Sequence, residues 1–305
     1  MQQINVQDLL DAGVHFGHQT RRWNPKMKPY IFMERGRIYI IDLEKTMESL
    51  ETAREAIYRV VREGGTVLFV ATKKQAKSVI IEEAKRCGMH YVTERWLGGM
   101  LTNFQTIRQS IRYLRNLERM DEDGTMAKLS KKESSRKMKQ KAKLDSIFSG
   151  IKEMSRLPGL VFILDTKREH IAVREATRLG IPSIGIVDTN ADPEEVTYPV
   201  PGNDDAMRAI KLYARFVSDT VLEARASAPP VPEQAPTASV AAGAISGRGR
   251  GRGAWSSEAP PREGAGRTPT HHGIRSGTTG QHVRRKACRS TPRPSRNCAS
   301  APAPG

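Results

Sequence analysis

The feature that most constrains the fold is an alternation of short, unbroken apolar runs with longer stretches of helical periodicity. Three runs are apolar almost throughout, at residues 66–71, 160–164 and 183–187. Runs of this kind are typical of strands buried on both faces of a parallel sheet. Shorter strands are predicted at 38–41 and 90–92, and helices at about 43–62, 74–87, 168–179 and 204–223. The pattern predicts an α/β fold, doubly wound, in which helices cover both faces of a parallel sheet.

A long interruption between the first and second buried runs has a helical pattern of its own. Apolar residues step by three and four along two segments: Phe104, Ile107, Ile111, Leu114 and Leu117, then Leu144, Ile147, Ile151 and Met154. An acidic turn at residues 121–124 separates them. We expect an inserted antiparallel helical hairpin, of coiled-coil type, whose apolar seams face each other.

The expected organisation therefore has four parts. An α/β domain is split into 1–102, which includes an N-terminal basic loop, and 158–225, and the hairpin occupies 103–157. Residues 226–305 form a tail rich in Arg, Pro, Ala and Gly, which is expected to be disordered because it has too few apolar residues to bury. Its Gly-Arg repeat at 247–253 is compatible with loose RNA binding or with no role, and we assign it no function.

The charge of the chain favours a polyanionic partner. The 305 residues carry 50 Lys and Arg against 33 Asp and Glu, a net charge of +17. The tail holds 12 bases and three acids, hence +9, which leaves +8 for residues 1–225. Three cysteines without metal spacing, short apolar runs and an N-terminus without a leader pattern argue against a disulfide scaffold, a membrane protein or a secreted one. We expect a cytoplasmic protein.

Little in the sequence indicates catalysis or a bound cofactor. No glycine-rich phosphate loop follows a predicted strand, and no nucleophile elbow or C-x-x-C pair occurs. His15 and His18 would need a third ligand, from Asp188, Asp204 or Asp205, to hold a metal. A lone histidine pair is more often structural or RNA-facing, so we predict neither metal nor cofactor and leave that site open. Cys87 has no companion thiol and is expected to pack.

Bases interleaved with aromatic residues are typical of RNA-binding surfaces, and they occur here in several segments. Two prolines are expected to hold the segment of residues 20–37 extended, and a double glycine in residues 95–103 lets backbone approach a partner. In that second segment Thr102 or Asn103 can cap the first hairpin helix, and Trp96 is as suited to the core as to RNA. The residues predicted to bind RNA are Arg21, Arg22, Trp23, Lys26, Lys28, Arg35, Arg37, Lys73, Lys74, Arg95, Trp96, Asn103, Arg108, Arg112, Arg115, Lys131, Lys132, Arg136 and Lys137.

Several motifs in order resemble the family of bacterial small-subunit ribosomal protein S2. They are LLDAGVHFGH at 9–18, WNP at 23–25, TKKQA at 72–76, RWLGG at 95–99, and PGLVFILD at 158–165 followed by Glu175 and GIP at 180–182. The resemblance spans about residues 6–221 and excludes the tail. It implies a flavodoxin-like domain with an inserted hairpin, bound to small-subunit ribosomal RNA between head and body. It also implies contacts with other small-subunit proteins, support for docking of ribosomal protein S1, no membrane, no homo-oligomer and no chemistry at the sheet.

Two other functions remain open from the residues alone. A nucleotide-handling or sugar-phosphate enzyme would use Lys73, Asp165 and Asp188 at the strand ends, where open parallel sheets bind ligands. A cytosolic scaffold would use the hairpin to bind proteins. Charge reversal of Arg108, Arg112 and Arg115 separates RNA binding, which it weakens, from protein binding, which survives it.

Overall fold

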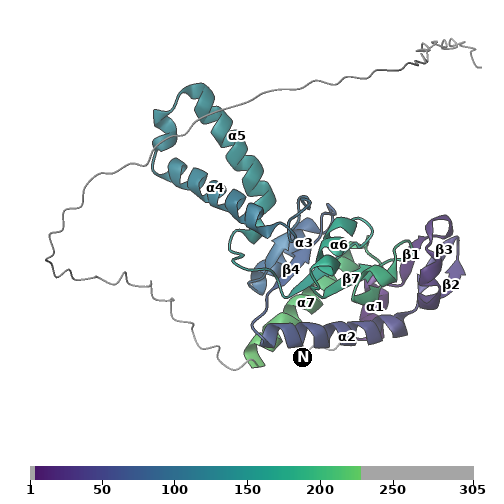
Figure 1. Cartoon of the computed structure of the whole chain (residues 1–305). Coiled ribbons are helices and arrows are strands. Elements are labelled where there is room, and N and C mark those ends of the chain that lie inside the picture. Colours follow the sequence, from purple (N-terminus) through teal and green to yellow (C-terminus); the bar gives the residue numbers. More distant parts are fainter. Residues whose placement is uncertain (1–3, 228–305) are drawn as a thin grey trace, which may run out of the picture. The chain divides into compact units, whose positions relative to one another are not determined.

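The computed structural model describes residues 4–227 and contains two sheets with helices around them (Figure 1). The helices are α1 (Val6–Ala12), α2 (Leu43–Arg62), α3 (Lys77–Arg86), α4 (Phe104–Glu122), α5 (Lys131–Phe148), α6 (His170–Arg178) and α7 (Met207–Ser227). The strands are β1 (Phe16–Gln19), β2 (Ile31–Arg35), β3 (Ile38–Ile41), β4 (Val67–Val70), β5 (His90–Val92), β6 (Leu160–Ile163), β7 (Ser183–Val187) and β8 (Tyr198–Pro201). None of these helices is long and apolar enough to cross a membrane.

The larger sheet is parallel throughout, with the strand order β5-β4-β6-β7-β8. Numbered along the chain within this sheet, the order is 2-1-3-4-5, that of flavodoxin-like folds. Its central strands are completely buried, because helices cover both faces. The predicted doubly wound α/β class is confirmed.

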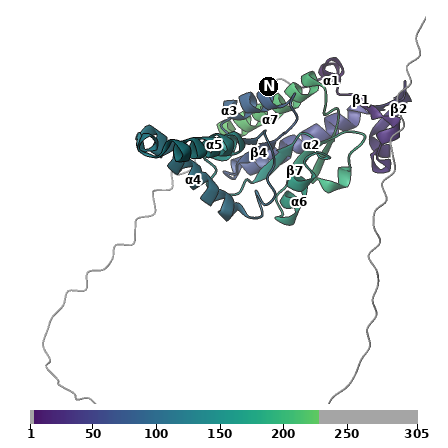
Figure 2. The ribbon, with the colours of Figure 1, turned by 90° about the horizontal axis from the view of Figure 1, so that it is seen from above.

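The alternation of side chains along each strand divides the core into two layers. Phe69 and Phe162 point to the layer shared with α2, α3 and α7, and their rings meet edge to face with centroids 5.6 Å apart. Leu68 and Ile163 point to the other layer, which includes α6 and the ends of α4 and α5 that adjoin the sheet. Figure 2 shows α2 and α7 on one side of the strands and α6 on the other.

The three remaining strands form a separate antiparallel sheet with the order β1-β3-β2. The strand at 38–41 was therefore predicted correctly but assigned to the wrong sheet. The connection between β2 and β3 consists of Gly36 and Arg37, both with positive φ (61° and 64°), as a type I′ hairpin turn requires. Thr189, just after β7, anchors this sheet: its hydroxyl accepts a hydrogen bond from the His18 amide at 2.9 Å.

Several boundaries differ from those predicted. The prolines Pro25 and Pro29 lie in a 3-10 helix, Pro25–Tyr30, and not in an extended loop, because Asn24 caps that turn by accepting from the Lys26 amide. Helix α3 begins at Lys77 rather than at residue 74, and α7 spans Met207–Ser227 rather than 204–223. Helices α4 and α5 contact each other, as expected of a hairpin, and Figure 1 shows them converging toward the α/β domain. Ile151 and Met154, however, follow the end of α5. The tail from residue 228 lies outside the described residues.

Candidate nucleic-acid interface

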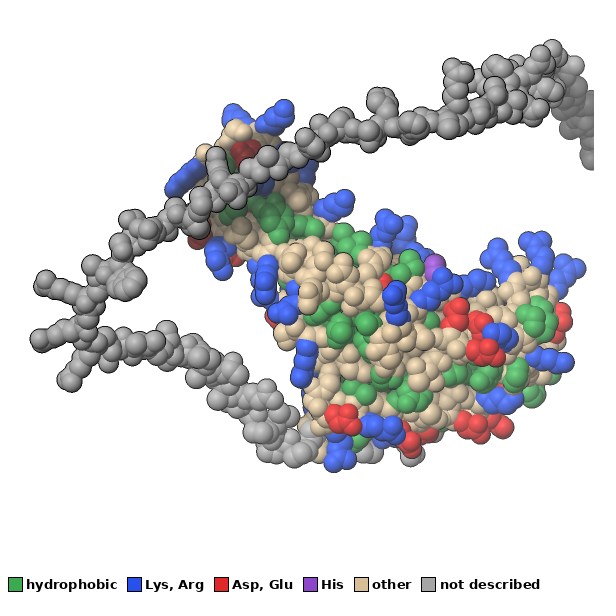
Figure 3. Space-filling view, in the orientation of Figure 1, with side chains coloured by type: hydrophobic (Ala, Val, Ile, Leu, Met, Phe, Trp, Pro, Cys, Tyr) green, Lys and Arg blue, Asp and Glu red, His purple; other side chains and the backbone are tan. Residues whose placement is uncertain are grey.

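Five bases on the small sheet and the segment beside it have exposed side chains. They are Arg21 and Arg22 in the 3-10 turn Thr20–Arg22, Lys28 in the next turn, Arg35 at the end of β2, and Arg37 in the hairpin turn. We call this set the sheet-tip surface. None of the five makes an ion pair or a side-chain hydrogen bond within residues 4–227, so their charges are available to a phosphate. In Figure 3, Lys and Arg side chains gather over this sheet and along the hairpin.

Two other residues of the same segment are already engaged. The ammonium of Lys26 lies 2.8 Å from Asp192 and 2.6 Å from Glu194, and these hydrogen bonds raise the pKa of Lys26. Trp23 is half-buried, with its ring centroid 5.4 Å from that of Tyr39. Lys26 is thus neutralised by its own chain, while Trp23 packs on the sheet and keeps part of its ring accessible.

Lys73 is not available to RNA, which corrects the prediction made from its place at a strand end. Its side chain is buried, and its Nζ lies 2.9 Å from Asp165, 2.9 Å from Asp204 and 2.7 Å from Asp205. Burial lowers the pKa of Lys73, but the carboxylates outweigh that effect and raise it, so the amine stays charged. The next residue, Lys74, is exposed.

Trp96 also belongs to the core and not to an exposed RNA contact. It is buried, and its indole Nε1 donates to Oε1 of Glu175 at 3.1 Å. The same carboxylate accepts from the amides of Gly99, Leu101 and Thr102 at 2.8–3.0 Å, and from the Thr102 hydroxyl. Burial raises the pKa of Glu175, but these hydrogen bonds outweigh it and lower the pKa below its usual range. Arg95 remains exposed beside this loop.

The predicted cap of α4 takes a different form. Asn103 occupies the N-cap position, but its side chain accepts from the Thr106 hydroxyl at 2.9 Å and bonds no backbone amide of the helix. Thr102, the other candidate, is held by Glu175. Glu175 therefore organises the entrance to the hairpin, a role that local sequence could not reveal because 72 residues separate it from Asn103.

The hairpin carries bases on both helices. In residues 103–157 there are 14 Lys and Arg and seven Asp and Glu, a net charge of +7. Exposed bases on this surface, which we call the hairpin surface, are Arg108, Arg112 and Arg115 on α4 and Lys131, Lys132 and Arg136 on α5. Arg115 also donates to the carbonyl of Lys152 at 2.6 Å, and Lys137 pairs with Glu133 at 3.5 Å. Arg108 and Arg112 make no such contact within residues 4–227.

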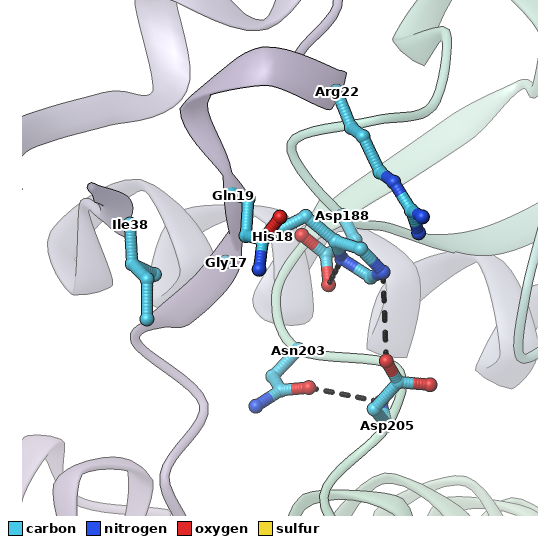
Figure 4. A pocket seen from close by; sticks show the side chains of 8 residues that line it. All are labelled: Gly17, His18, Gln19, Arg22, Ile38, Asp188, Asn203 and Asp205. Carbon is cyan, nitrogen blue, oxygen red and sulfur yellow. Dashed lines mark hydrogen bonds and ion pairs between the residues drawn. The ribbon is translucent and has the colours of Figure 1, made fainter. Parts of the chain in front are cut away.

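A hollow of about 370 Å³ lies between the small sheet and the ends of β7 and β8 (Figure 4). His18 Nδ1 lies 2.9 Å from Asp188 and its Nε2 3.5 Å from Asp205. The contact with Asp188 raises the pKa of His18, and burial beside Asp188 and Asp165 raises that of Asp204 to about 7. Arg22 stands at the edge of this hollow.

Three of these side chains could hold a metal ion. Ligand atoms of His18, Asp188 and Asp204 lie within 4.8 Å of one another. One imidazole nitrogen and two carboxylates are donors that suit Zn²⁺ or a similar divalent cation. His15 is not in the group: burial lowers its pKa, and its ring lies against Phe16 with centroids 4.0 Å apart. Cys87 is buried, which raises its pKa to about 11, so it has the packing role expected of it.

Comparison with known proteins shows which family this chain resembles. The family model for ribosomal protein S2 matches residues 9–224, which include both parts of the α/β domain and the whole hairpin. The chain belongs to the ribosomal protein S2 family. Two relatives named small ribosomal subunit protein uS2, from two strains of Treponema pallidum, are each 56% identical over 221 residues. The alignments cover 72% of this chain and 76% of each relative.

Membership in this family confirms the resemblance found in the motifs. The protein is a bacterial ribosomal protein, a structural constituent of the small subunit in the cytoplasm, and not an enzyme. The nucleotide-handling alternative is therefore wrong. Its three candidate residues serve the fold, since Lys73 pairs with Asp165, and Asp188 contacts His18. The match ends at residue 224, before the tail.

Proposed function

We propose that the protein binds small-subunit ribosomal RNA through the sheet-tip and hairpin surfaces, with the α/β domain as a rigid platform. The observation that carries this proposal is the set of five exposed bases at the sheet tip that have no acidic partner within residues 4–227. Side chains of this kind neutralise phosphates and release counterions, which gives affinity without reading sequence. Lys26, which sits among them but is paired with two carboxylates, contributes little.

Two features support the division of the interface into separate surfaces. The sheet tip presents Arg35 at the end of β2 and Arg37 in the hairpin turn, and its other three bases lie in the two 3-10 helices beside the sheet. The hairpin consists of two long helices, of 19 and 18 residues, and its bases lie along both of them. Such a row of bases can contact several successive phosphates of an RNA backbone. Lys74, Arg95 and the half-buried Trp23 extend the predicted contact set beyond these two surfaces.

Salt dependence of RNA binding tests the proposal. The chain and a variant with Arg21, Arg22, Arg35 and Arg37 changed to Ala are titrated with small-subunit ribosomal RNA at several salt concentrations. The slope of log K against log salt should fall by roughly one for each phosphate contact removed. A matched variant with Arg59, Arg62, Lys85 and Arg178 changed to Ala should keep the original slope. Equal slopes for the two variants would contradict the sheet-tip assignment.

We further propose that the protein supports docking of ribosomal protein S1, that it contacts neighbouring small-subunit proteins, and that it does so as a single copy. The family resemblance supports this role. The test is to purify small subunits with and without the chain and to measure how much S1 each retains. Equal retention would contradict the docking role and leave the RNA-binding proposal untouched.

A further inference from the structure

A second hollow, of about 810 Å³, lies among α1, α2 and α7, and none of the bases of the two basic surfaces lines it. These three helices pack on one another, and Figure 2 shows them as neighbours. Its apolar lining comes from Ile4, Met47, Leu50, Leu212, Phe216 and Leu222. Leu50 is buried and most of the others are only half-covered, so residues 4–227 leave an apolar groove unfilled. Its volume lies in the range of pockets that hold ligands in proteins.

The walls of this groove have opposite charges. The wall formed by α1 carries Asp8 and Asp11. The wall formed by the first turns of α7 carries Arg208, Lys211 and Arg215, which share one face of that helix because they are three and four positions apart. Arg208 and Lys211 are exposed and make no ion pair within residues 4–227.

The other charged residues that line the groove pair with one another. Arg54 on α2 lies 3.4 Å from Glu223 and 3.7 Å from Glu51. Arg215 lies 3.8 Å from Asp219, one turn further along α7. The open charges are thus confined to the α1 wall and to the beginning of α7.

We propose that this groove docks an amphipathic helix of a partner protein, with its apolar stripe on the floor, acidic residues along α7 and basic residues along α1. A helix placed in this way buries side chains spaced at i, i+3, i+4 and i+7 and pairs its two flanks with the two walls. RNA is a poor occupant, because its phosphates would meet Asp8 and Asp11 and its sugars an apolar floor. An apolar groove with charged rims is the usual form of a protein interface.

The proposal is tested with the full chain and three synthetic helical peptides, by fluorescence anisotropy. The first has a Leu stripe with Glu on one flank and Lys on the other, and the second has the same stripe with Lys on both flanks. The third scrambles the first and so destroys the stripe. We expect the first peptide to bind at least tenfold more tightly than either of the others. Because a helix can reverse its direction in the groove, exchanging the two flanks would be no test, and for this reason the all-Lys peptide is used.

A double variant, Arg208→Glu with Lys211→Glu, makes both walls acidic. It should bind the all-Lys peptide more tightly than the mixed one, reversing the order of the unaltered chain. The matched control, Lys85→Glu with Arg178→Glu, changes the charge equally on α3 and α6, outside the groove and both basic surfaces, and should keep the original order. Melting temperatures of both variants, which change only exposed side chains, verify that they fold.

Three results would overturn the inference. The first is a scrambled peptide that binds as tightly as the mixed one, and the second is an unchanged order of affinities in the Arg208/Lys211 variant. The third is a concentration-dependent dimer in sedimentation equilibrium that the Arg208/Lys211 variant abolishes, which would assign the groove to a second copy of this chain instead.

Discussion

The carboxylate of Glu175 on α6 accepts a hydrogen bond from the indole of Trp96, at 3.1 Å, in the interior of the protein. Through three backbone amides the same carboxylate also holds the loop that leads into α4. One buried side chain of the α/β domain therefore holds the loop from which the inserted hairpin begins. Removing that side chain would free several buried donors at once.

We expect Glu175→Ala to destabilise the protein by about 3 kcal/mol, because buried donors left without an acceptor cost about 1–3 kcal/mol each. The melting temperature should fall by roughly 6–12 °C for a protein of this size. Glu175→Gln, which keeps the shape and some acceptor capacity, should lose less. Thermal unfolding followed by circular dichroism measures both. A loss below about 1 kcal/mol in the Ala variant would contradict the role given to this carboxylate.

Stability should also depend on pH through Glu175. Its pKa is lower in the folded protein than in the unfolded chain, where a glutamate titrates near about pH 4.3. The stabilisation is therefore fully present above the unfolded value and is lost as pH falls through the folded value. Urea unfolding between about pH 3 and pH 7 measures the effect: as the pH falls, the free energy of unfolding should decrease more steeply for the unaltered chain than for Glu175→Gln. An equal decrease for both proteins would contradict the assignment.

Lys73→Met should destabilise the fold without altering RNA binding per folded molecule. The substitution leaves Asp165, Asp204 and Asp205 close together with no ammonium between them, and breaking a buried ion pair costs about 3–5 kcal/mol. The salt slope for RNA should be unchanged, because this amine is buried. A slope reduced by one, with stability intact, would restore Lys73 to the RNA interface.

Charge reversal on the hairpin separates RNA binding from protein binding. Arg108→Glu with Arg112→Glu should lower the salt slope for ribosomal RNA by about two and weaken association with the small subunit. The matched reversal of Lys85 and Arg178, exposed bases elsewhere, should have little effect. If the hairpin bound proteins in place of RNA, RNA affinity would survive the reversal.

Truncation within α7 and just after it should have different effects. A chain that ends at Ser227 keeps the whole helix and should sediment with small subunits as the full chain does. A chain that ends at Ala224 loses Arg225, which donates to the carbonyl of Cys87 at 2.6 Å, and should be less stable by about 1–3 kcal/mol. Sucrose-gradient sedimentation and thermal unfolding measure the two effects. Failure of the Ser227 chain to sediment would give the tail a role in assembly.

Strands could be predicted from the sequence where their apolar residues follow one another without interruption. The runs around Phe69, Phe162 and Ile184 are unbroken, because both faces of the parallel sheet are covered. Strands β1 and β2 were missed because their faces are half-exposed and mixed in composition. Strand β8 was missed because it contains Pro199 and Pro201, which an edge strand tolerates since one side of it donates to no neighbour.

The candidate site could be predicted from sequence only for residues whose type alone makes their side chains exposed. Arg21, Arg22, Arg35 and Arg37 are exposed, as bases usually are. Lys73 and Trp96 are exceptions, because each is buried against a partner that lies far along the chain. Asp205 is 132 residues from Lys73, and Glu175 is 79 residues from Trp96, so no local sequence pattern indicates either contact. Burial of a polar or amphipathic side chain is a property of the pair, and only the folded structure brings the pair together.

The order of the parallel sheet also affects how the protein can be made. Val67 of β4 pairs with Leu160 of β6, so β4 has to wait for a neighbour that is synthesised 93 residues later. At about 5–20 residues per second the delay is roughly 5–19 s. During that time one side of a wholly apolar strand is an unpaired edge, open to other nascent chains. The inserted hairpin, besides carrying bases, sets the length of this exposed interval during translation.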